Sequence, residues 1–216
     1  MAFSIFRIFG FTGTFFIVLG IVSAALLYHG KKGERFSLFN HFISELGEVG
    51  ISRAAWAFNL GLILGGLALI PSIIGLGLRF NSLLGWLGTG IGVIALLGVT
   101  AVGFYPMNDL TTHGRAAMTY FRAGLGMVFF FGLAILFQPA NTVRISQFAN
   151  LFSLLAFLAY GAFLLLLARS SRKHRSDPPL DPQQEPERPR FWLMAMLEWA
   201  VFFSTVLWLF GMAFQL

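Results

Sequence analysis

The stretch AAWAFNLGLILGGLALIPSIIGLGL, residues 54–78, decides the fold class of this chain. It contains no Asp, Glu, Lys or Arg. It is also longer than the roughly 20 apolar residues that an α-helix needs to cross about 30 Å of hydrocarbon. We therefore predict that this stretch is a transmembrane helix.

Five further apolar runs lie outside this stretch, at residues 8–28, 83–104, 116–138, 148–168 and 191–214. None alternates polar and apolar residues with a period of two, so helices are expected rather than a closed β-barrel. The first run is longer than the 7 to 15 apolar residues of a secretion signal, and we interpret it as a retained span. The sequence thus predicts an all-α, polytopic bundle of six transmembrane helices, with residues 1–216 as a single membrane domain.

The composition of the whole chain agrees with this fold class. Of the 216 residues, 57% are hydrophobic and 11% are charged, whereas an ordinary soluble domain carries about 25% charged residues. A soluble enzyme is thereby excluded. The net charge is +6, but the Lys and Arg residues flank apolar runs instead of gathering on one solvated face, so we expect no nucleic-acid partner. The absence of Cys excludes disulfides, thiolate metal sites and a Cys nucleophile.

Glycines in two of the runs have the spacing of helix contacts. Gly61 and Gly65 form one small-xxx-small pair, and Gly88 and Gly92 form another. Such pairs let transmembrane backbones approach closely. We interpret them as packing faces and not as binding sites.

The distribution of Lys and Arg between the connecting loops predicts the orientation. The first, third and fifth loops together carry eleven of these residues, and the opposite side carries three: Arg7, Arg79 and Arg144. The positive-inside rule then places loops 1, 3 and 5 in the cytoplasm and both termini outside. The fifth loop, residues 170–190, is predicted to be a polar, Pro-rich linker.

The first loop has the pattern of a short amphipathic helix between the first two spans. Its apolar residues repeat every three to four positions, at Phe36, Phe39, Phe42, Ile43 and Leu46, and polar residues fall on the opposite face. One interpretation is an interfacial helix that lies on the bilayer. The other turns the polar face inward over the bundle.

Two His and two carboxylates with matched spacing are candidates for chemistry on the same membrane surface. His41 and Glu45 are four residues apart, as are Asp109 and His113. The four residues have the donor types of a zinc-like shell, or of general acid and base catalysis. The alternative is that they serve hydrogen-bonded loop packing.

Inside the spans the sequence leaves two ionisable side chains, Arg122 and Glu198. Helix geometry places Arg122 about 10 Å beyond Arg115 and Glu198 about 12 Å beyond Arg190, so an ion pair at equal depth is expected. Asn59 falls in the same layer. The pair has either a structural role, or it borders a pocket in which Arg122 holds an anionic lipid phosphate or carboxylate.

Several short strings resemble a known family. They are residues 40–47 (NHFISELG), Phe58 with Asn59, residues 104–106 (FYP), His113 with Gly114, and Ala117. They are similar to a prokaryotic family of uncharacterised six-helix membrane proteins, distantly similar to the eukaryotic group of damage-regulated autophagy modulators. The resemblance implies a six-helix fold, a place in a prokaryotic cell membrane and a role near lipids. Tyr105 interrupts the usual Phe-Pro junction, and family members usually place these loops outside.

These observations leave three functional classes open. The first is binding of a membrane lipid or other amphiphile in the polar layer of Arg122, Glu198 and Asn59. The second is a metal-assisted membrane hydrolase acting on a lipid. The third is an accessory subunit that contacts partner helices, as part of a larger complex or a homo-oligomer. The sequence assigns no cofactor, and it leaves open whether the protein is an enzyme.

Overall fold

The computed structural model describes residues 2–139, 145–176 and 188–214. Apart from two short 3-10 helices, its regular structure consists of six long α-helices. In chain order the elements are α1 (Ala2–Leu26), η1 (Ile43–Gly47), α2 (Ala55–Phe80), α3 (Leu83–Phe104), α4 (Leu110–Leu136), η3 (Gln147–Ala149), α5 (Asn150–Ser176) and α6 (Leu193–Phe214).

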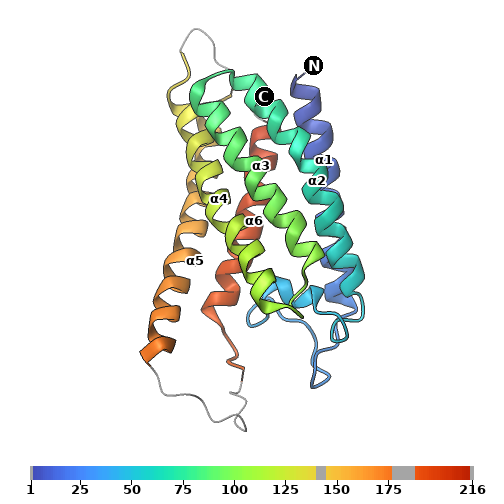
Figure 1. Cartoon of the computed structure of the whole chain (residues 1–216). Helices are drawn as coiled ribbons and strands as arrows, with labels where there is room; N and C mark the ends of the chain where they lie inside the picture. Colours follow the sequence, from blue (N-terminus) through green and yellow to red (C-terminus); the bar gives the residue numbers. More distant parts are fainter. Residues whose placement is uncertain (1, 140–144, 177–187, 215–216) are drawn as a thin grey trace.

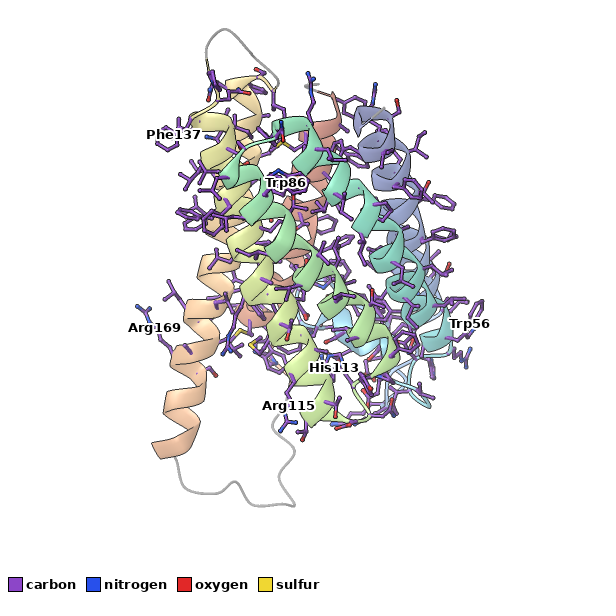
Figure 2. All side chains as sticks on the ribbon, turned by 45° about the horizontal axis from the view of Figure 1, so that its top comes forward. Trp56, Trp86, His113, Arg115, Phe137 and Arg169 are labelled. Atoms are coloured by element: carbon purple, nitrogen blue, oxygen red, sulfur yellow. The ribbon has the colours of Figure 1, made fainter. Side chains whose placement is uncertain are left out.

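All six α-helices are long and apolar enough to cross a membrane, which confirms the predicted all-α, six-span fold. They form one bundle with both termini at one end (Figure 1). The connections after α1 (residues 27–54, loop 1) and after α3 (residues 105–109, loop 3) lie at the other end. Trp56 and Phe137 project outward from the bundle and are 70% and 68% exposed (Figure 2). The chain is therefore a multi-pass integral membrane protein.

Three helices extend by six or more residues beyond the predicted spans, and one of them is α1, which begins at Ala2 instead of Ile8. α4 begins at Leu110 because Oδ1 of Asp109 accepts a hydrogen bond from the N–H of Thr112 at 3.1 Å and caps the helix. α5 continues to Ser176, so the first part of the predicted linker is helical. Residues 177–187 of that linker lie outside the described residues.

Loop 1 does not form the predicted amphipathic helix. Only η1 is helical there, and its Glu45 and Leu46 are buried against the bundle. The reason lies in the backbone donors. The N–H of Phe42 donates to Oε1 of Glu45 at 2.8 Å, and the N–H of Ile43 donates to Oε2 of Glu198 on α6, also at 2.8 Å. Because side-chain carboxylates satisfy these donors and tie the segment to α6, loop 1 folds over the bundle instead of lying along the bilayer.

The glycine pairs lie at helix contacts, as predicted. A Cβ atom at Gly61 would come within 2.7 Å of the carbonyl oxygen of Phe16 on α1, closer than real Cβ atoms approach. A Cβ atom at Gly65 would lie 2.6 Å from the carbonyl oxygen of Gly13, also on α1. On α3, a Cβ atom at Gly88 would lie about 3 Å from the ring of Phe131 on α4, and one at Gly92 would lie about 3 Å from the side chains of Ile73 on α2 and Met127 on α4. α1 and α2 therefore pack with their backbones in contact, which fixes α1 as one wall of the bundle interior.

Candidate functional site

A cavity of about 120 Å³ lies inside the bundle beneath loop 1. Its walls come from five of the six long helices, and Ile43 and Ser44 of loop 1 also line it. Most of the lining side chains are apolar. The polar ones are Thr14, Ser44, His113, Tyr120, Glu198 and Thr205. An apolar chamber with a few convergent polar groups is the usual form of a small-molecule site.

Glu198 is the acidic group of this cavity. It lies in the second turn of α6 and is 7% exposed. Its Oε2 accepts the hydrogen bond from Ile43, and no Lys, Arg or His of the described chain forms an ion pair with it. Burying a carboxylate at membrane depth is costly, and ionisable groups placed there usually serve a function. Glu198 is therefore the first candidate for ligand contact.

His113, in the first turn of α4, brings a second polar group to the cavity. It is 7% exposed, and its Nδ1 lies 2.8 Å from the carbonyl oxygen of Tyr105. Because a carbonyl only accepts, Nδ1 carries the hydrogen, and Nε2 of the neutral ring is an acceptor. His113 and Glu198 thus both contribute acceptor groups near the loop 1 end of the cavity.

Two threonines place hydroxyl groups in the deeper part of the cavity. Thr14 and Thr205 each lie about 18 Å along their helices from the loop 1 end. Oγ1 of Thr205 is 2.8 Å from the carbonyl oxygen of Val201 and 3.1 Å from the hydroxyl oxygen of Tyr160. Oγ1 of Thr14 is buried and has no hydrogen-bond partner within the described residues. A buried hydroxyl without a partner is uncommon, and it marks a place where a bound molecule would find one.

Arg188, just before α6, fastens loop 1 over the cavity. Its two terminal nitrogens donate to Oε1 and Oε2 of Glu45 at 2.9 and 2.8 Å, and Nη1 also donates to the carbonyl oxygen of Asn40 at 2.7 Å. The hydrogen bonds to Glu45 raise the pKa of Arg188. Planar two-point pairing of this kind fixes geometry as well as charge.

Two tryptophans add further contacts between loop 1 and α6. Nε1 of Trp199 donates to the carbonyl oxygen of His41 at 3.1 Å. The backbone N–H of Trp192 donates to the carbonyl oxygen of Phe39 at 2.8 Å. Loop 1 is thus held along the first turns of α6 by backbone and side-chain bonds together.

His41 is buried in loop 1, where it lies against the rings of Tyr28 and Phe36 with centroids 5.3 and 5.1 Å away. The N–H of Ser37 donates to Nδ1 at 3.2 Å, so Nε2 carries the hydrogen of the neutral ring. Nε2 has no hydrogen-bond partner in the described chain and lies 3.9 Å from Oε1 of Glu34. Burial lowers the pKa of His41 below its ordinary value.

Loop 1 is also tied to α2 and to loop 3 through amides. Nδ2 of Asn59 donates to the carbonyl oxygen of Gly47 at 3.0 Å. Asn108 of loop 3 makes a reciprocal pair with Val49, because its Oδ1 accepts from the Val49 N–H and its Nδ2 donates to the Val49 carbonyl, both at 2.9 Å. Asn59 therefore positions the end of loop 1 and does not line the cavity.

The predicted metal or catalytic candidates do not converge. Among the described residues no group of three or more His, Asp and Glu side chains is arranged to hold a metal ion. Asp109 is exposed and caps α4, His113 lines the cavity, His41 lies among aromatic rings, and Glu45 binds Arg188. The four-residue spacings are real, but each side chain is directed to a different partner.

The predicted ion pair between Arg122 and Glu198 is not formed. Arg122 is exposed on the outer face of α4, whereas Glu198 faces the interior. Equal depth along two helices does not determine the rotation of each helix about its axis, and this rotation points the two side chains in different directions. The polar layer predicted from Arg122, Glu198 and Asn59 is thus divided between an outer face, the cavity and a loop contact.

The residues that hold loop 1 were not among the candidates that the sequence suggested. Arg188 counted only as a charge of the linker, although it stands close in sequence to the predicted intramembrane Glu198. Trp199 carried a usable signal, because an indole N–H inside a span needs an acceptor. Nothing in the sequence pointed to Asn108 as the partner of Val49.

A search of curated proteins found no match, and neither did a search of solved structures. The model of one family, described as "Protein of unknown function (DUF998)", matches residues 8–215, which is nearly the whole chain. The chain therefore belongs to this family of uncharacterised proteins.

Proposed function

We propose that this protein binds an amphiphile within the membrane. The apolar part of the ligand occupies the cavity, and its headgroup lies beneath loop 1 beside Glu198 and His113. The observation that carries the proposal is the buried carboxyl group of Glu198, which faces a largely apolar cavity and has no cationic partner among the described residues. A carboxylate in this position is explained by a ligand that donates to it.

The lining favours a particular headgroup chemistry. Glu198, the Nε2 of neutral His113 and the hydroxyl of Ser44 are acceptors or neutral groups, and none of the described lining residues is Lys or Arg. A headgroup with hydroxyl or amine donors fits these partners, whereas a phosphate or carboxylate would find no cationic side chain among the described lining residues. The cavity volume is close to the roughly 150 Å³ of an engineered apolar cavity that binds benzene, so it holds a segment of an apolar chain.

The distant resemblance to the damage-regulated autophagy modulators implies a role near lipids and is in keeping with this proposal. No contact in the described structure favours the metal-assisted hydrolase over simple binding. Arg122 is not part of the cavity site, because it lies on the outer face of α4.

A photoreactive monoacylglycerol with a long chain, reconstituted with the protein in nanodiscs, tests the proposal. We expect crosslinks to cavity residues of α1, α4 and α6, found by peptide mass spectrometry. Glu198→Leu should reduce them by removing the headgroup acceptor, and Ala95→Leu should reduce them by filling the cavity, since Ala95 is a buried lining residue.

Gly90→Ala is the matched control, because a Cβ atom at this position meets nothing within 4 Å. Its crosslinking should equal that of the wild type. Crosslinks that map only to lipid-facing residues, in equal amounts in all variants, would contradict the proposal. Recovery of a stable complex with another membrane protein, together with no cavity crosslinks, would favour the accessory-subunit class.

A further inference from the structure

A second feature lies on the outer face of α4, apart from the cavity. Arg115 and Arg122 are both exposed and line a shallow, open depression of the surface. The remaining lining residues, all of α4, are Thr111, Gly114, Met118 and Thr119. Residues seven apart lie on one face of an α-helix, so both guanidinium groups belong to the same strip of surface.

The direction of the helix brings the two arginines toward the same membrane surface. Cα–Cβ bonds of an α-helix tilt toward its N-terminus. The N-terminus of α4 lies at the loop 1 end of the bundle, so Arg122 leans toward Arg115 and toward the nearer headgroup layer. Arg122 lies about 18 Å along α4, where an unpaired charge in hydrocarbon is costly, and extension toward that layer relieves the cost.

The charges around the depression favour an anion. Neither arginine forms an ion pair with a carboxylate of the described chain, and no acidic side chain lines the depression. The nearest acidic neighbour in sequence, Asp109, accepts a hydrogen bond from the Thr112 N–H at the start of α4.

We propose that Arg115 and Arg122 form a binding site for the headgroup phosphate of an anionic phospholipid on the membrane surface that carries loop 1. Guanidinium groups match the geometry of phosphate oxygens and form charge-assisted, two-point hydrogen bonds with them. Gly114 has no side chain to crowd the space beside Arg115. This site is independent of the cavity proposal, because it uses no cavity residue and selects an anionic headgroup instead of one with hydroxyl or amine donors.

The test uses the full chain in mild detergent with a fluorescent phosphatidylglycerol, read by fluorescence anisotropy. The variant Arg115→Gln with Arg122→Gln should bind the probe roughly tenfold more weakly or worse, since hydrogen bonds to charged groups contribute that much. Arg115→Lys with Arg122→Lys, which keeps the charge but loses the planar fork, should fall between the two. Unlabelled phosphatidylglycerol should displace the probe, whereas phosphatidylcholine and millimolar inorganic phosphate should not.

Arg53→Gln is the matched control, because Arg53 is an exposed arginine in loop 1, at the same end of the bundle. It should bind the probe as the wild type does. Equal loss of binding in Arg53→Gln would show that total charge and not the α4 site attracts the lipid. Unchanged binding in the double Gln variant, or displacement by inorganic phosphate alone, would also overturn the proposal. Thermal unfolding of each variant in the same detergent verifies that it is folded.

Discussion

Arg188 and Glu45 are 143 positions apart in the chain, and they are joined by two parallel hydrogen bonds of 2.9 and 2.8 Å. The side chain of Glu45 is 8% exposed and that of Arg188 is 34% exposed, so the pair lies at the boundary between the bundle and water. It closes loop 1 onto the segment that leads into α6. Ile43 and Ser44, which line the cavity, stand directly before Glu45.

The first prediction is that these two residues are energetically coupled. Glu45→Gln, Arg188→Gln and the double variant form a mutant cycle, measured by thermal unfolding in detergent. We expect a coupling energy of about 1–2 kcal/mol, since contacting charged residues that share hydrogen bonds do not act additively. Arg190→Gln, an exposed arginine two positions away, should leave the unfolding temperature unchanged. An additive double variant would contradict the coupling.

The second prediction is that Arg122 and Glu198 act independently. Because one faces outward and the other faces the cavity, the effects of Arg122→Met and Glu198→Leu on the unfolding free energy should add to within about 0.5 kcal/mol in the double variant. A buried ion pair would behave differently, because removing both partners would recover stability relative to removing Glu198 alone. Such a recovery would show that the two side chains meet in the membrane.

The third prediction concerns pH and His41. Burial holds the pKa of His41 below the ordinary value of 6.5, so as the pH falls the unfolded chain takes up a proton before the folded protein does. The contribution of His41 is complete above pH 6.5 and is lost as the pH drops through the lower, folded pKa. The neighbouring charges of Glu34, Glu45 and Arg188 modulate this shift without reversing it.

The measurement compares unfolding temperatures between pH 8 and pH 5 for the wild type and for His41→Phe. The wild type should lose stability over the acidic half of this range more steeply than the variant. The difference between the two curves isolates His41 from the other histidines. Parallel curves would mean that His41 does not titrate differently in the folded and unfolded states.

The fourth prediction tests the contact between α1 and α2. Gly61→Ala should destabilise the protein by about 1–3 kcal/mol, because its Cβ would overlap the carbonyl oxygen of Phe16 and push the helices apart. Gly90→Ala is the control in open space, and it should be neutral or stabilising by up to about 1 kcal/mol. Equal effects at the two positions would show that helix propensity and not close packing decides the outcome.

The fifth prediction is the orientation in the membrane. In this Cys-free chain, single cysteines at Ser171 and Ser82 should react with an impermeant thiol reagent from opposite faces. The charge distribution predicts that Ser171 is labelled only after the cytoplasmic face is opened. Labelling of both positions from one face would contradict the six-span topology, and labelling of Ser171 from outside would reverse the orientation.

The spans were predictable because their cause is local. A backbone in hydrocarbon must satisfy its own hydrogen bonds, so a run such as residues 54–78 forms a helix whatever surrounds it. The helix contacts at Gly61 and Gly65 were also predictable, since only small residues allow two helix backbones to approach closely. The start of α4 was misplaced because hydropathy does not register the cap that Asp109 provides to a polar first turn. The pattern of loop 1 predicted a helix, but the carboxylates of Glu45 and Glu198 accept hydrogen bonds from backbone N–H groups that a helix would use.

The sequence by itself therefore determined six helices, their order and the polar residues that need a partner. Only the tertiary structure decided which partners they find. Arg122 and Glu198 are at similar depth, yet the rotation of α4 and α6 about their axes directs one to the outer surface of the bundle and the other to the cavity. The pairing of Arg188 with Glu45 joins segments from opposite ends of the chain, and no local rule specifies it. Helix formation depends on contacts within a few residues, whereas a site of this kind depends on how whole helices and loops pack together.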